Sequence, residues 1–540
     1  MMKISTIILL IFLLRTLSKV VESSEILIIS QQPYLSHQQV AARLADDLAT
    51  HGHNITIFTS NHFGNYHENI KEFNFKTQTL QKVERNIHKN WLQIYNDLTD
   101  LHYGLSIKQL RHPEIKKIMK NETKFDVLII DCVICQLLAI AEVQDIPVIY
   151  LSQTEPLNFV NDHFGNVVNP SIHPETHALG YRHAKLTLYQ RFNSFFSYHF
   201  WKFIGGFHHC VIIRRSLTRE YPNLNVTCNQ LLERLNFLFI FTHPAFGNVR
   251  PLVPKTIQVG FTYVDPVVDV KDEGLREFMD NSKDGVIVFN VDGLHADELN
   301  VFMNVFGELK QSVVFNVENS TDLLSSLSSP NSPNSPNSPN SSNSPNSPNP
   351  PNQKIFSTKN AKLSEIIGHP NVKLVVSTAD YREIEVMLKN HMPMVLVPLT
   401  HEQIVISHLM VERKVAKFID VLKTNETALL ESIQQVLTYH STFKENARKL
   451  EAFATDRPRL RDMAVWHVEF VIRHKGAKHL DYSGRLVPYF QKMFFDIYLF
   501  FGFLIYGIIK GIKLYRMLKW KICGKLSCRE LNGGAKSKKE

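Results

Sequence analysis

The stretch Gly368–Gln403, GHPNVKLVVSTADYREIEVMLKNHMPMVLVPLTHEQ, decides the fold of this chain. Its apolar runs and breakers predict a strand, a turn, a helix and a second strand, at Val372–Val376, Ser377–Tyr381, Arg382–Asn390 and Met394–Val397. The helix places Ile384, Met387 and Leu388 on one apolar stripe, while the strands are apolar throughout. Such strands are typical of a parallel sheet that is buried on both faces. The stretch therefore predicts a βαβ unit inside an α/β domain.

The turn at Ser377–Tyr381 is a candidate site for a phosphate group. In a βαβ unit, ligands lie beyond the carboxyl ends of the strands, against a helix N-terminus whose free N–H groups favour anions. The alternative is a Rossmann-like half that binds no ligand, because a fold does not imply a function.

Length and composition indicate a globular protein of more than one domain. The 540 residues exceed the usual size of one domain, and 44% hydrophobic with 21% charged residues is ordinary. The formal net charge of +9 does not indicate nucleic-acid binding, since much of the excess lies beyond residue 509, behind a hydrophobic segment. A basic tail in that position is typical of charge next to a membrane.

Two hydrophobic segments predict the topology. Met1–Ser18 contains an apolar run, Ile7–Leu14, that is too short to span a bilayer, so residues 1–24 are predicted to be a secretory signal peptide. Residues 493–509 are about long enough to span a bilayer and predict a transmembrane helix, with a packed core helix as the alternative. The predicted topology is type I, with a luminal body and a basic cytoplasmic tail at residues 510–540.

The cysteines and sequons are compatible with a luminal body. Cys132 and Cys135 form a C-x-x-C pair, for which small core residues are favoured over a redox or metal site because no second Cys/His pair is evident. We therefore predict no metal site. Cys210 and Cys228 could form a luminal disulfide. Asn-x-Ser/Thr sequons, which can accept N-linked glycans, occur at Asn54, Asn121, Asn225, Asn319, Asn340 and Asn425.

The first half of the chain opens with another βαβ pattern. Glu25–Ser30 predicts the first strand, and Ser36 with Gln39 predicts a capping box before the helix Val40–Thr50. His37 then falls in the first turn of this helix, at the carboxyl end of the first strand. Catalytic residues of open α/β sheets lie at that edge.

Asp131 is predicted to lie at the same sheet edge as His37. It directly follows the predicted strand Asp126–Ile130. A carboxylate that orients an imidazole makes histidine an effective general base. The pair His37–Asp131 is therefore the candidate catalytic site, and the alternative is that His37 is a solvated residue at a helix start.

The second half contains a second domain with a low-complexity insertion. A linker near Asp265–Glu273 precedes the predicted strand Gly285–Asn290. From Ser329 to Asn352 the triplet Ser-Pro-Asn repeats with slight variation, and proline at every third position predicts a disordered or polyproline II loop. Helices are predicted at Leu429–Leu437 and Phe443–Phe453.

Several motifs fall in the register of one known family. They are Gly368-His369-Pro370, Pro393, Pro398 and Gln403 in the donor stretch, and Ser36-His37, Gly52-His53, Phe125–Asp131 and the run Ala464–Ala477 elsewhere. On these residues the chain, from about residue 25 to residue 510, resembles the membrane-bound UDP-glycosyltransferases (the UDP-glucuronosyl/glucosyltransferase family), in particular their arthropod-like branch.

This resemblance implies two Rossmann-like domains, the GT-B type of glycosyltransferase architecture, followed by a transmembrane helix. Residues 25–265 would form the acceptor-binding domain, residues 275–445 the donor-binding domain, and residues 446–488 helices that cross back onto the first domain. The implied activity is inverting transfer of a sugar from a UDP-sugar to the hydroxyl of a small lipophilic acceptor. His37 would be the general base and Asp131 its partner.

The resemblance also implies the remaining partners. The UDP-sugar is a co-substrate, no cofactor is expected, and Glu402 and Gln403 are the implied donor-binding residues. Lys536 and Lys538 resemble a dilysine retrieval signal to the endoplasmic reticulum membrane, with a generic basic tail as the alternative. No nucleic-acid partner is expected, and a homo- or hetero-oligomer is left open.

The donor stretch departs from the family pattern. The family's stacking Trp and its Gln fall on Asn360 and Leu363, its His-Gly-Gly on Thr378–Asp380, its Glu on Val386 beside Glu385, and its Gly on His391. Asp380 would put a negative charge where the diphosphate is expected. The alternative prediction is therefore a catalytically impaired member that has lost UDP-sugar binding and acts as an acceptor-binding or partner subunit.

Overall fold

The computed structural model describes residues 23–533 with gaps. The residues outside it are 1–22, 33–34, 65–66, 76–84, 132–135, 176–178, 180–185, 246, 248, 265–267, 318–353, 359–360, 458–459 and 534–540. Most of the predicted signal peptide, the C-x-x-C pair, the Ser-Pro-Asn insertion and the two tail lysines therefore lie outside the described residues. The chain divides into a body, Met1–Leu480, and a C-terminal unit, Asp481–Glu540.

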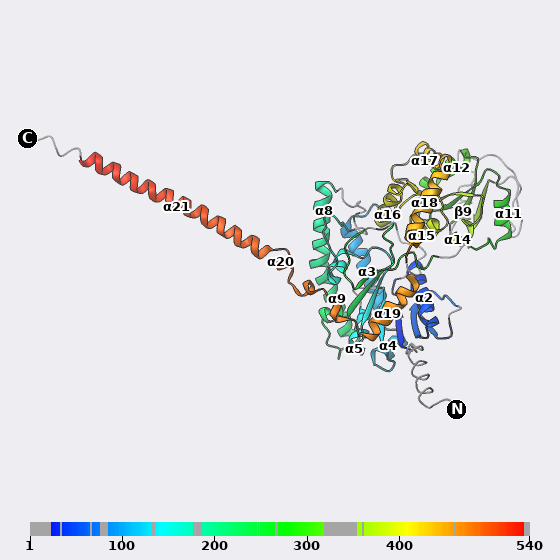
Figure 1. The fold of residues 1–540 in the computed structure, drawn as a ribbon, viewed down its shortest axis with the longest axis horizontal. Coiled ribbons are helices and arrows are strands. Elements are labelled where there is room, and N and C mark those ends of the chain that lie inside the picture. Colours follow the sequence, from blue (N-terminus) through cyan, green and yellow to red (C-terminus); the bar gives the residue numbers. More distant parts are fainter. Residues whose placement is uncertain are drawn as a thin grey trace, which may run out of the picture. The chain divides into compact units, whose positions relative to one another are not determined.

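Figure 1 shows the fold of the body. Its first sheet is parallel, and the described strands follow the order β3-β2-β1-β4-β5-β6-β7. They are β1 (Glu25–Ile29), β2 (Asn54–Thr59), β3 (Ile70–Asn74), β4 (Val127–Ile130), β5 (Val148–Ser152), β6 (Leu235–Ile240) and β7 (Thr256–Gln258). Leu27 and Ile29 pack into one core cluster, whereas Ile26 and Ile28 pack into another. Because successive side chains of a strand point to opposite faces, this alternation shows a sheet covered on both sides.

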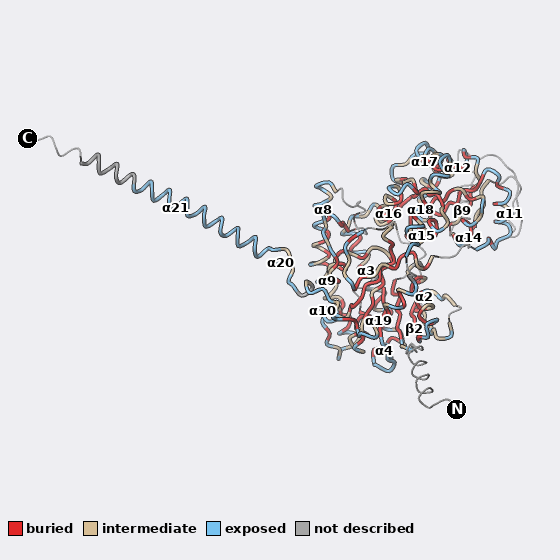
Figure 2. Tube along the Cα trace, viewed as in Figure 1, coloured by how far each residue is buried: buried red, intermediate tan, exposed pale blue. Residues whose placement is uncertain are grey.

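The second sheet is also parallel, and its described strands follow the order β10-β9-β8-β11-β12-β13. They are β8 (Val286–Asn290), β9 (Ser312–Asn316), β10 (Ile355–Thr358), β11 (Val372–Ser377), β12 (Met394–Leu396) and β13 (Ala416–Phe418). Val286 and Val288 pack into one cluster, and Ile287 and Phe289 into another. Figure 2 shows the strands of the body as buried chain. The two sheets confirm the predicted pair of Rossmann-like domains.

Helices cover both sheets. In the first domain they are α2 (Leu35–Thr50), α3 (Trp91–Leu110), α4 (Pro113–Met119), α5 (Ala139–Gln144), α6 (Asn158–Phe164), α8 (Leu188–His199), the π-helical η2 (Phe200–Gly205), α9 (Gly206–Glu220) and α10 (Cys228–Glu233), with a 3-10 turn η1 (Gln136–Leu138). In the second domain they are α11 (Glu273–Asn281), α12 (Ala296–Glu308), α14 (Leu363–Ile366), α15 (Tyr381–Lys389), α16 (His401–Glu412), α17 (Glu426–Thr438) and α18 (His440–Thr455).

The stretch Gly368–Gln403 folds as its pattern predicts, and each element begins and ends within one residue of its predicted bounds. β11, α15 and β12 follow one another, and the stripe Ile384, Met387 and Leu388 is fully buried. One capping prediction is wrong. α2 begins at Leu35, so Ser36 is its second residue and not its N-cap. The helix simply starts earlier than the capping-box pattern indicates, and His37 remains in its first turn.

The helix α19 (Leu460–Arg473) packs onto the first domain, but the predicted crossing segment 446–488 begins too early, because Ala447, Leu450 and Ala454 of α18 pack into a core cluster of the second domain. In α19, Ala464, Val465 and Val468 are buried in the cluster that also contains Ile26 and Leu44 of β1 and α2. The 3-10 turn η3 (Lys478–Leu480) follows it and ends the body. Helix α19 thus follows the second domain in the sequence but packs in the hydrophobic core of the first domain.

The C-terminal unit contains η4 (Ser483–Leu486), α20 (Tyr489–Lys492) and the long helix α21 (Phe495–Gly533). Within α21, Phe495–Ile522 is long and apolar enough to cross a membrane. The helix continues well past Ile509, where the sequence predicts the end of the span. Lys and Arg are good helix formers, so the basic residues after the apolar run do not interrupt the helix.

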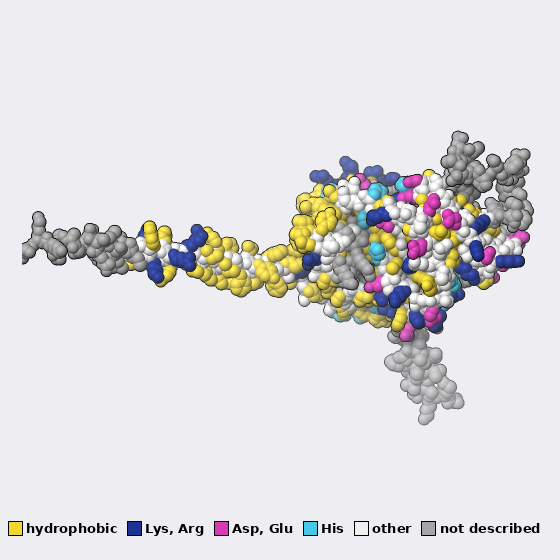
Figure 3. Space-filling model, turned by 90° about the horizontal axis from the view of Figure 1, so that it is seen from above, with side chains coloured by type: hydrophobic (Ala, Val, Ile, Leu, Met, Phe, Trp, Pro, Cys, Tyr) yellow, Lys and Arg dark blue, Asp and Glu magenta, His cyan; other side chains and the backbone are white. Residues whose placement is uncertain are grey.

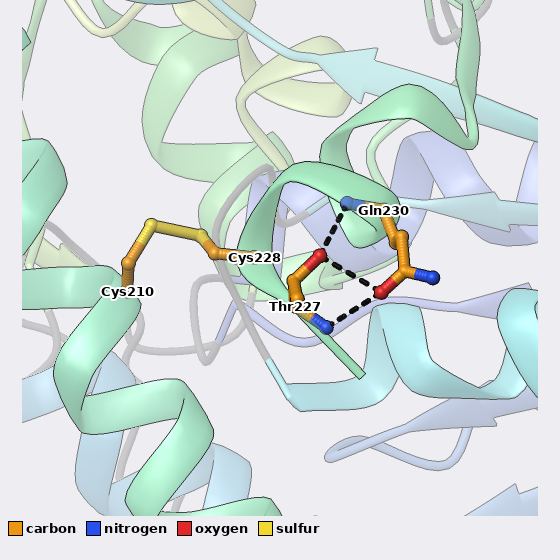
Figure 4. Close-up of a disulfide and its surroundings, with 4 residues drawn as sticks. All are labelled: Cys210, Thr227, Cys228 and Gln230. Carbon is orange, nitrogen blue, oxygen red and sulfur yellow. Dashed lines mark hydrogen bonds between the residues drawn. A yellow bond between two sulfur atoms is a disulfide. The ribbon is translucent and has the colours of Figure 1, made fainter. Parts of the chain in front are cut away.

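The predicted Cys210–Cys228 disulfide is present, with 5.4 Å between the two Cα atoms (Figure 4). It joins α9 to the first residue of α10. Thr227 caps α10 beside it, because the Gln230 N–H donates to Thr227 Oγ1 (3.3 Å) and the Thr227 N–H donates to Gln230 Oε1 (2.8 Å). The long helical run α8–η2–α9 is therefore tied covalently, through the second turn of α9, to the capped start of α10.

Candidate active site

Asp131 lies at the carboxyl end of β4, and its carboxylate is held by the loop after β1. It accepts hydrogen bonds from Ser30 Oγ (2.9 Å), from the Gln31 N–H (2.6 Å) and from the Gln32 N–H (3.3 Å). Only 3% of Asp131 is exposed. Burial raises the pKa of Asp131 to about 7, although the hydrogen bonds oppose the rise. The carboxyl group is thus fixed in place, and burial favours its neutral form.

The loop that holds Asp131 is itself held by two helices. Gln31 donates through Nε2 to Ser106 of α3, and its carbonyl accepts from Gln109 Nε2 (3.2 Å). The Gln32 carbonyl accepts from Gln38 Nε2 of α2 (3.1 Å). These polar residues are buried, so the loop geometry does not depend on a ligand.

His37 is the third residue of α2 and is half-buried. Its carbonyl accepts from Gln153 Nε2 (3.4 Å), and Gln153 directly follows β5. The structure therefore places His37 and Asp131 at the carboxyl edge of the same sheet, on neighbouring segments. The side-chain contact between His37 and Asp131 stays a prediction.

At the second sheet, Asp380 caps the helix that was expected to face a diphosphate. Asp380 is the N-cap of α15, and its Oδ1 accepts from the Arg382 N–H (2.9 Å). A helix N-terminus is stabilised by a negative charge, and here the chain supplies that charge itself. The carboxylate of Asp380 therefore supplies, at the predicted phosphate site, the negative charge that a phosphate group would bring.

A polar chain ties α15 to the strands beside it. Glu383 accepts from Asn290 Nδ2 at the end of β8 (2.8 Å) and from Ser377 Oγ at the end of β11 (2.6 Å). Asn290 Oδ1 in turn accepts from Asn316 Nδ2 at the end of β9 (2.9 Å). The carboxyl ends of three strands are thus hydrogen-bonded to each other or to the first turn of α15.

Glu385, the acid next to the family's donor Glu position, has a different role. It is buried and accepts from the Phe261 N–H (2.6 Å) and from Arg382 Nη1 (2.8 Å). Burial raises the pKa of Glu385, and Arg382 opposes the rise. Val386, at the family position itself, is in the hydrophobic core. Neither side chain is directed by these contacts to a ligand.

Gln403, predicted to bind the donor, builds the start of α16. Its Oε1 accepts from the N–H groups of Leu399 (2.8 Å) and Thr400 (3.1 Å), and its own N–H donates to Thr400 Oγ1 (3.2 Å). This is a complete capping box. Glu402 is half-exposed in the same turn. Donor binding by Glu402 and Gln403 stays a prediction, and the amide oxygen of Gln403 already serves the helix.

The segment Arg85–Ile87 of the first domain binds the second domain at the same edge. Arg85 forms a two-pronged ion pair with Glu298 of α12, with both N–O distances at 2.7 Å. The Asn86 N–H donates to the Leu399 carbonyl (3.0 Å), and its side-chain oxygen accepts from the His401 N–H at the start of α16 (3.0 Å). Burial lowers the pKa of His401 to about 4, so this histidine brings no positive charge.

The sequence reasoning missed Ser30, Gln31, Arg85 and Asn86. The first two had a readable signal, because polar residues directly follow the apolar strand β1 at the edge where sites occur. Arg85 and Asn86 had no such signal, since their partners lie more than 200 residues away.

Among the described residues, no group of three or more His, Cys, Asp or Glu side chains is placed to hold a metal ion.

Two parallel α/β domains of this kind are the architecture of the GT-B glycosyltransferases. The solved structure of a UDP-glucosyltransferase from Polygonum tinctorium capable of glucosylating indoxyl has this fold, with a TM-score of 0.54 over 83% of this chain and 99% of that chain, at 12% identity. The family described as UDP-glucoronosyl and UDP-glucosyl transferase matches residues 36–529, and the chain belongs to this family.

Relatives from distant animals agree with the family assignment. UDP-glycosyltransferase UGT4 of Dactylopius coccus is 23% identical over 89% of this chain and 93% of its own length. UDP-glucuronosyltransferase 2B19 of Macaca fascicularis is 24% identical over 87% of this chain and 88% of its own length. The chain is thus similar to these transferases along almost its whole length.

Asp131→Asn should change how stability depends on pH. The folded-state pKa of Asp131 is raised from 3.8 to about 7. Neutral Asp131 therefore makes a contribution to the free energy of unfolding that is fully present below about pH 4 and is lost as the pH rises through about 7. One pKa unit corresponds to about 1.4 kcal/mol, so this loss is on the order of 4 kcal/mol. Thermal unfolding of both proteins across this range should show that the variant becomes more stable relative to the native protein as the pH rises.

The control is Gln144→Ala beside the start of β4, where the side chain accepts from the Phe125 N–H (3.0 Å) and carries no titratable group. Its difference from the native protein should be the same at both ends of the range. Parallel curves for Asp131→Asn and the native protein would contradict the assignment of a raised pKa to Asp131.

Proposed function

We propose that this chain transfers a sugar from a UDP-sugar to the hydroxyl of a small lipophilic acceptor, with inversion at the anomeric carbon. The observation that carries the proposal is the fixed, buried carboxylate of Asp131 beside the helix start that contains His37. Family membership supports the reaction class. The acceptor class follows the family resemblance.

In the proposed reaction His37 removes the proton of the acceptor hydroxyl. The hydroxyl oxygen forms a bond to the anomeric carbon from the face opposite the diphosphate, the bond from that carbon to the phosphate oxygen breaks, and UDP leaves with the electron pair. Ionised Asp131 stabilises the imidazolium that His37 becomes. General-base catalysis of this kind contributes about 10²–10⁴-fold to the rate.

The donor is proposed to bind at the carboxyl edge of the second sheet, with Glu402 and Gln403 beside the sugar. The helix N-termini at this edge would face the diphosphate, as they do for anions in α/β domains generally. Asp380 opposes this binding by its charge. We therefore propose a transferase whose affinity for its donor is low.

A second candidate function is that of an acceptor-binding or partner subunit that has lost the donor. It is favoured by one observation: the starts of α12, α15 and α16 are capped by the chain's own side chains. A protein of this kind would turn over no UDP-sugar, yet would still bind lipophilic acceptors at the first domain.

We further propose that the span Phe495–Ile522 anchors the protein in the endoplasmic reticulum membrane with the body in the lumen. The apolar part of this helix, up to Ile509, would cross the bilayer, and the basic residues after Ile509 would lie at its cytoplasmic surface.

His37→Ala should reduce turnover of a UDP-sugar by at least two orders of magnitude, because the variant loses its general base. The matched control is His51→Ala, just beyond the opposite end of α2, which should keep full activity. Both variants should unfold at the native temperature. Unchanged turnover in His37→Ala would remove this residue from the mechanism, whereas no turnover in the native protein with any UDP-sugar would favour the second candidate function.

Asp380→Asn should lower the KM for the UDP-sugar. Asn caps helices as well as Asp, so the substitution removes the charge and keeps the helix start. A carboxylate about 8 Å from a phosphate costs roughly 2 kcal/mol at an effective dielectric constant of about 20, which corresponds to more than a tenfold change in KM.

The control for Asp380→Asn is Asp272→Asn, the N-cap of α11, whose Oδ1 accepts from the Leu275 N–H (2.9 Å). α11 packs beside the edge strand β10 through the ring pair Phe278–Phe356 (5.3 Å), and its variant should leave KM unchanged. An unchanged KM in Asp380→Asn would mean that the diphosphate does not lie at the start of α15.

Protease added to sealed microsomes should remove only the segment that follows the membrane span. The luminal body should stay intact because the bilayer excludes the enzyme. Detergent should make the body accessible, which serves as the control. Digestion of the body in intact microsomes would show that the span is misassigned or reversed.

A further inference from the structure

The helical run α8–η2–α9 presents an aromatic face to the outside of the body. Its members are Phe192, Phe195, Phe196, Phe203, Ile204 and Phe207, which are between 47% and 73% exposed. We call these six residues the aromatic face. They recur at helical spacing along one side of a continuous helix. Figure 3 shows hydrophobic side chains gathered on the flank of the body that carries α8 in Figure 1.

The side of this helix that faces the body is less apolar than the exposed side. Ser194, Ser197 and Gly205 are buried, together with Tyr198 and Trp201. Ser194 Oγ donates to the Pro170 carbonyl (2.5 Å). A helix of a soluble protein normally has the reverse pattern, with its apolar stripe toward the core. Exposed apolar surfaces of this kind mark contacts with a partner or a membrane.

The stretch of sequence that carries the aromatic face contains positively charged side chains only, although Lys202 of this stretch pairs with Asp162 (2.6 Å). Residues 176–219 contain no Asp or Glu, while seven residues of this stretch are Lys or Arg. Among them Arg191, Arg214 and Arg215 are exposed on the same helical run. A helix with Phe on one face and Lys or Arg beside it is typical of helices that lie in the interface of a bilayer. Basic side chains there meet lipid phosphates.

We propose that the aromatic face lies in the interfacial layer of a lipid bilayer. This inference rests on the proposed membrane anchor, since the same chain contains the candidate span Phe495–Ile522. A second copy of the chain fits less well, because pairing two such faces would bring exposed arginines of both copies together, and like charges across an interface weaken association. Lipid phosphates instead complement these arginines.

The stretch Leu188–Phe207 is long enough to act as a second attachment. At 1.5 Å per residue it extends about 30 Å along the helix axis. The disulfide Cys210–Cys228 ties the following turns of α9 to α10, so the helix cannot separate from the domain when it enters the interface. The first domain is thus held against the bilayer directly and not only through the span.

The test uses the full chain in phosphatidylcholine vesicles that contain phosphatidylserine. The photoreactive amino acid benzoylphenylalanine replaces one phenylalanine at a time, at Phe196 and Phe207 in the aromatic face. Phe453 of α18 is the matched control, since it is 72% exposed and lies in the other domain. Phe503 in the candidate span, also 72% exposed, reports on the anchor. After illumination, mass spectrometry identifies what each position has bound.

We expect lipid adducts at Phe196, Phe207 and Phe503, at least tenfold above those at Phe453. Adducts at Phe503 alone would overturn the proposal for the aromatic face and leave the anchor intact. Adducts at Phe196 and Phe207 without Phe503 would support the face and contradict the anchor. Cross-links between two protein chains at Phe196 or Phe207 would overturn the lipid assignment in favour of a second copy.

Discussion

Parallel strands end at one edge of a sheet, and the helix that follows each strand begins there with N–H groups that have no partner within the helix. Everything at such an edge depends on what accepts these hydrogen bonds and what charge is brought there. A ligand can do so, and so can the protein. This constraint acts on both sheets of the present chain, and the two sheets satisfy it in different ways.

The first sheet concentrates its polar groups on one carboxylate. Ser30, Gln31 and Gln32 all donate to Asp131, and the pKa of this residue is raised to about 7 by burial. At the second sheet several side chains form the hydrogen bonds, at a helix start or at the end of a strand. One of them, Asp380, brings a charge of the same sign as that of a diphosphate. One edge fixes a single buried carboxylate, whereas the other supplies its own negative charge at a helix start.

The architecture could be predicted from the sequence because apolar runs and breakers are local signals, and strands such as β2 and β11 lie where their patterns predict. Asp131 was predictable for the same reason, as a polar residue that ends an apolar strand. The start of α2 could not be predicted, because Ser36 and Gln39, the residues of the capping-box pattern, are also compatible with positions within a helix. The use of Gln403 as a cap and the Arg85–Glu298 ion pair depend on tertiary contacts, which no local pattern encodes.

The most direct measurement for the central claim is a calorimetric titration of UDP into the full-length protein. UDP carries the base, the ribose and the diphosphate, so it tests the second sheet edge without any acceptor or any chemistry. Each lost hydrogen bond to a charged group costs about 1.5–3 kcal/mol, so a self-capped edge predicts heats that saturate only at millimolar UDP. Saturation at low micromolar UDP would contradict the account, because it would show an edge that is open to the diphosphate.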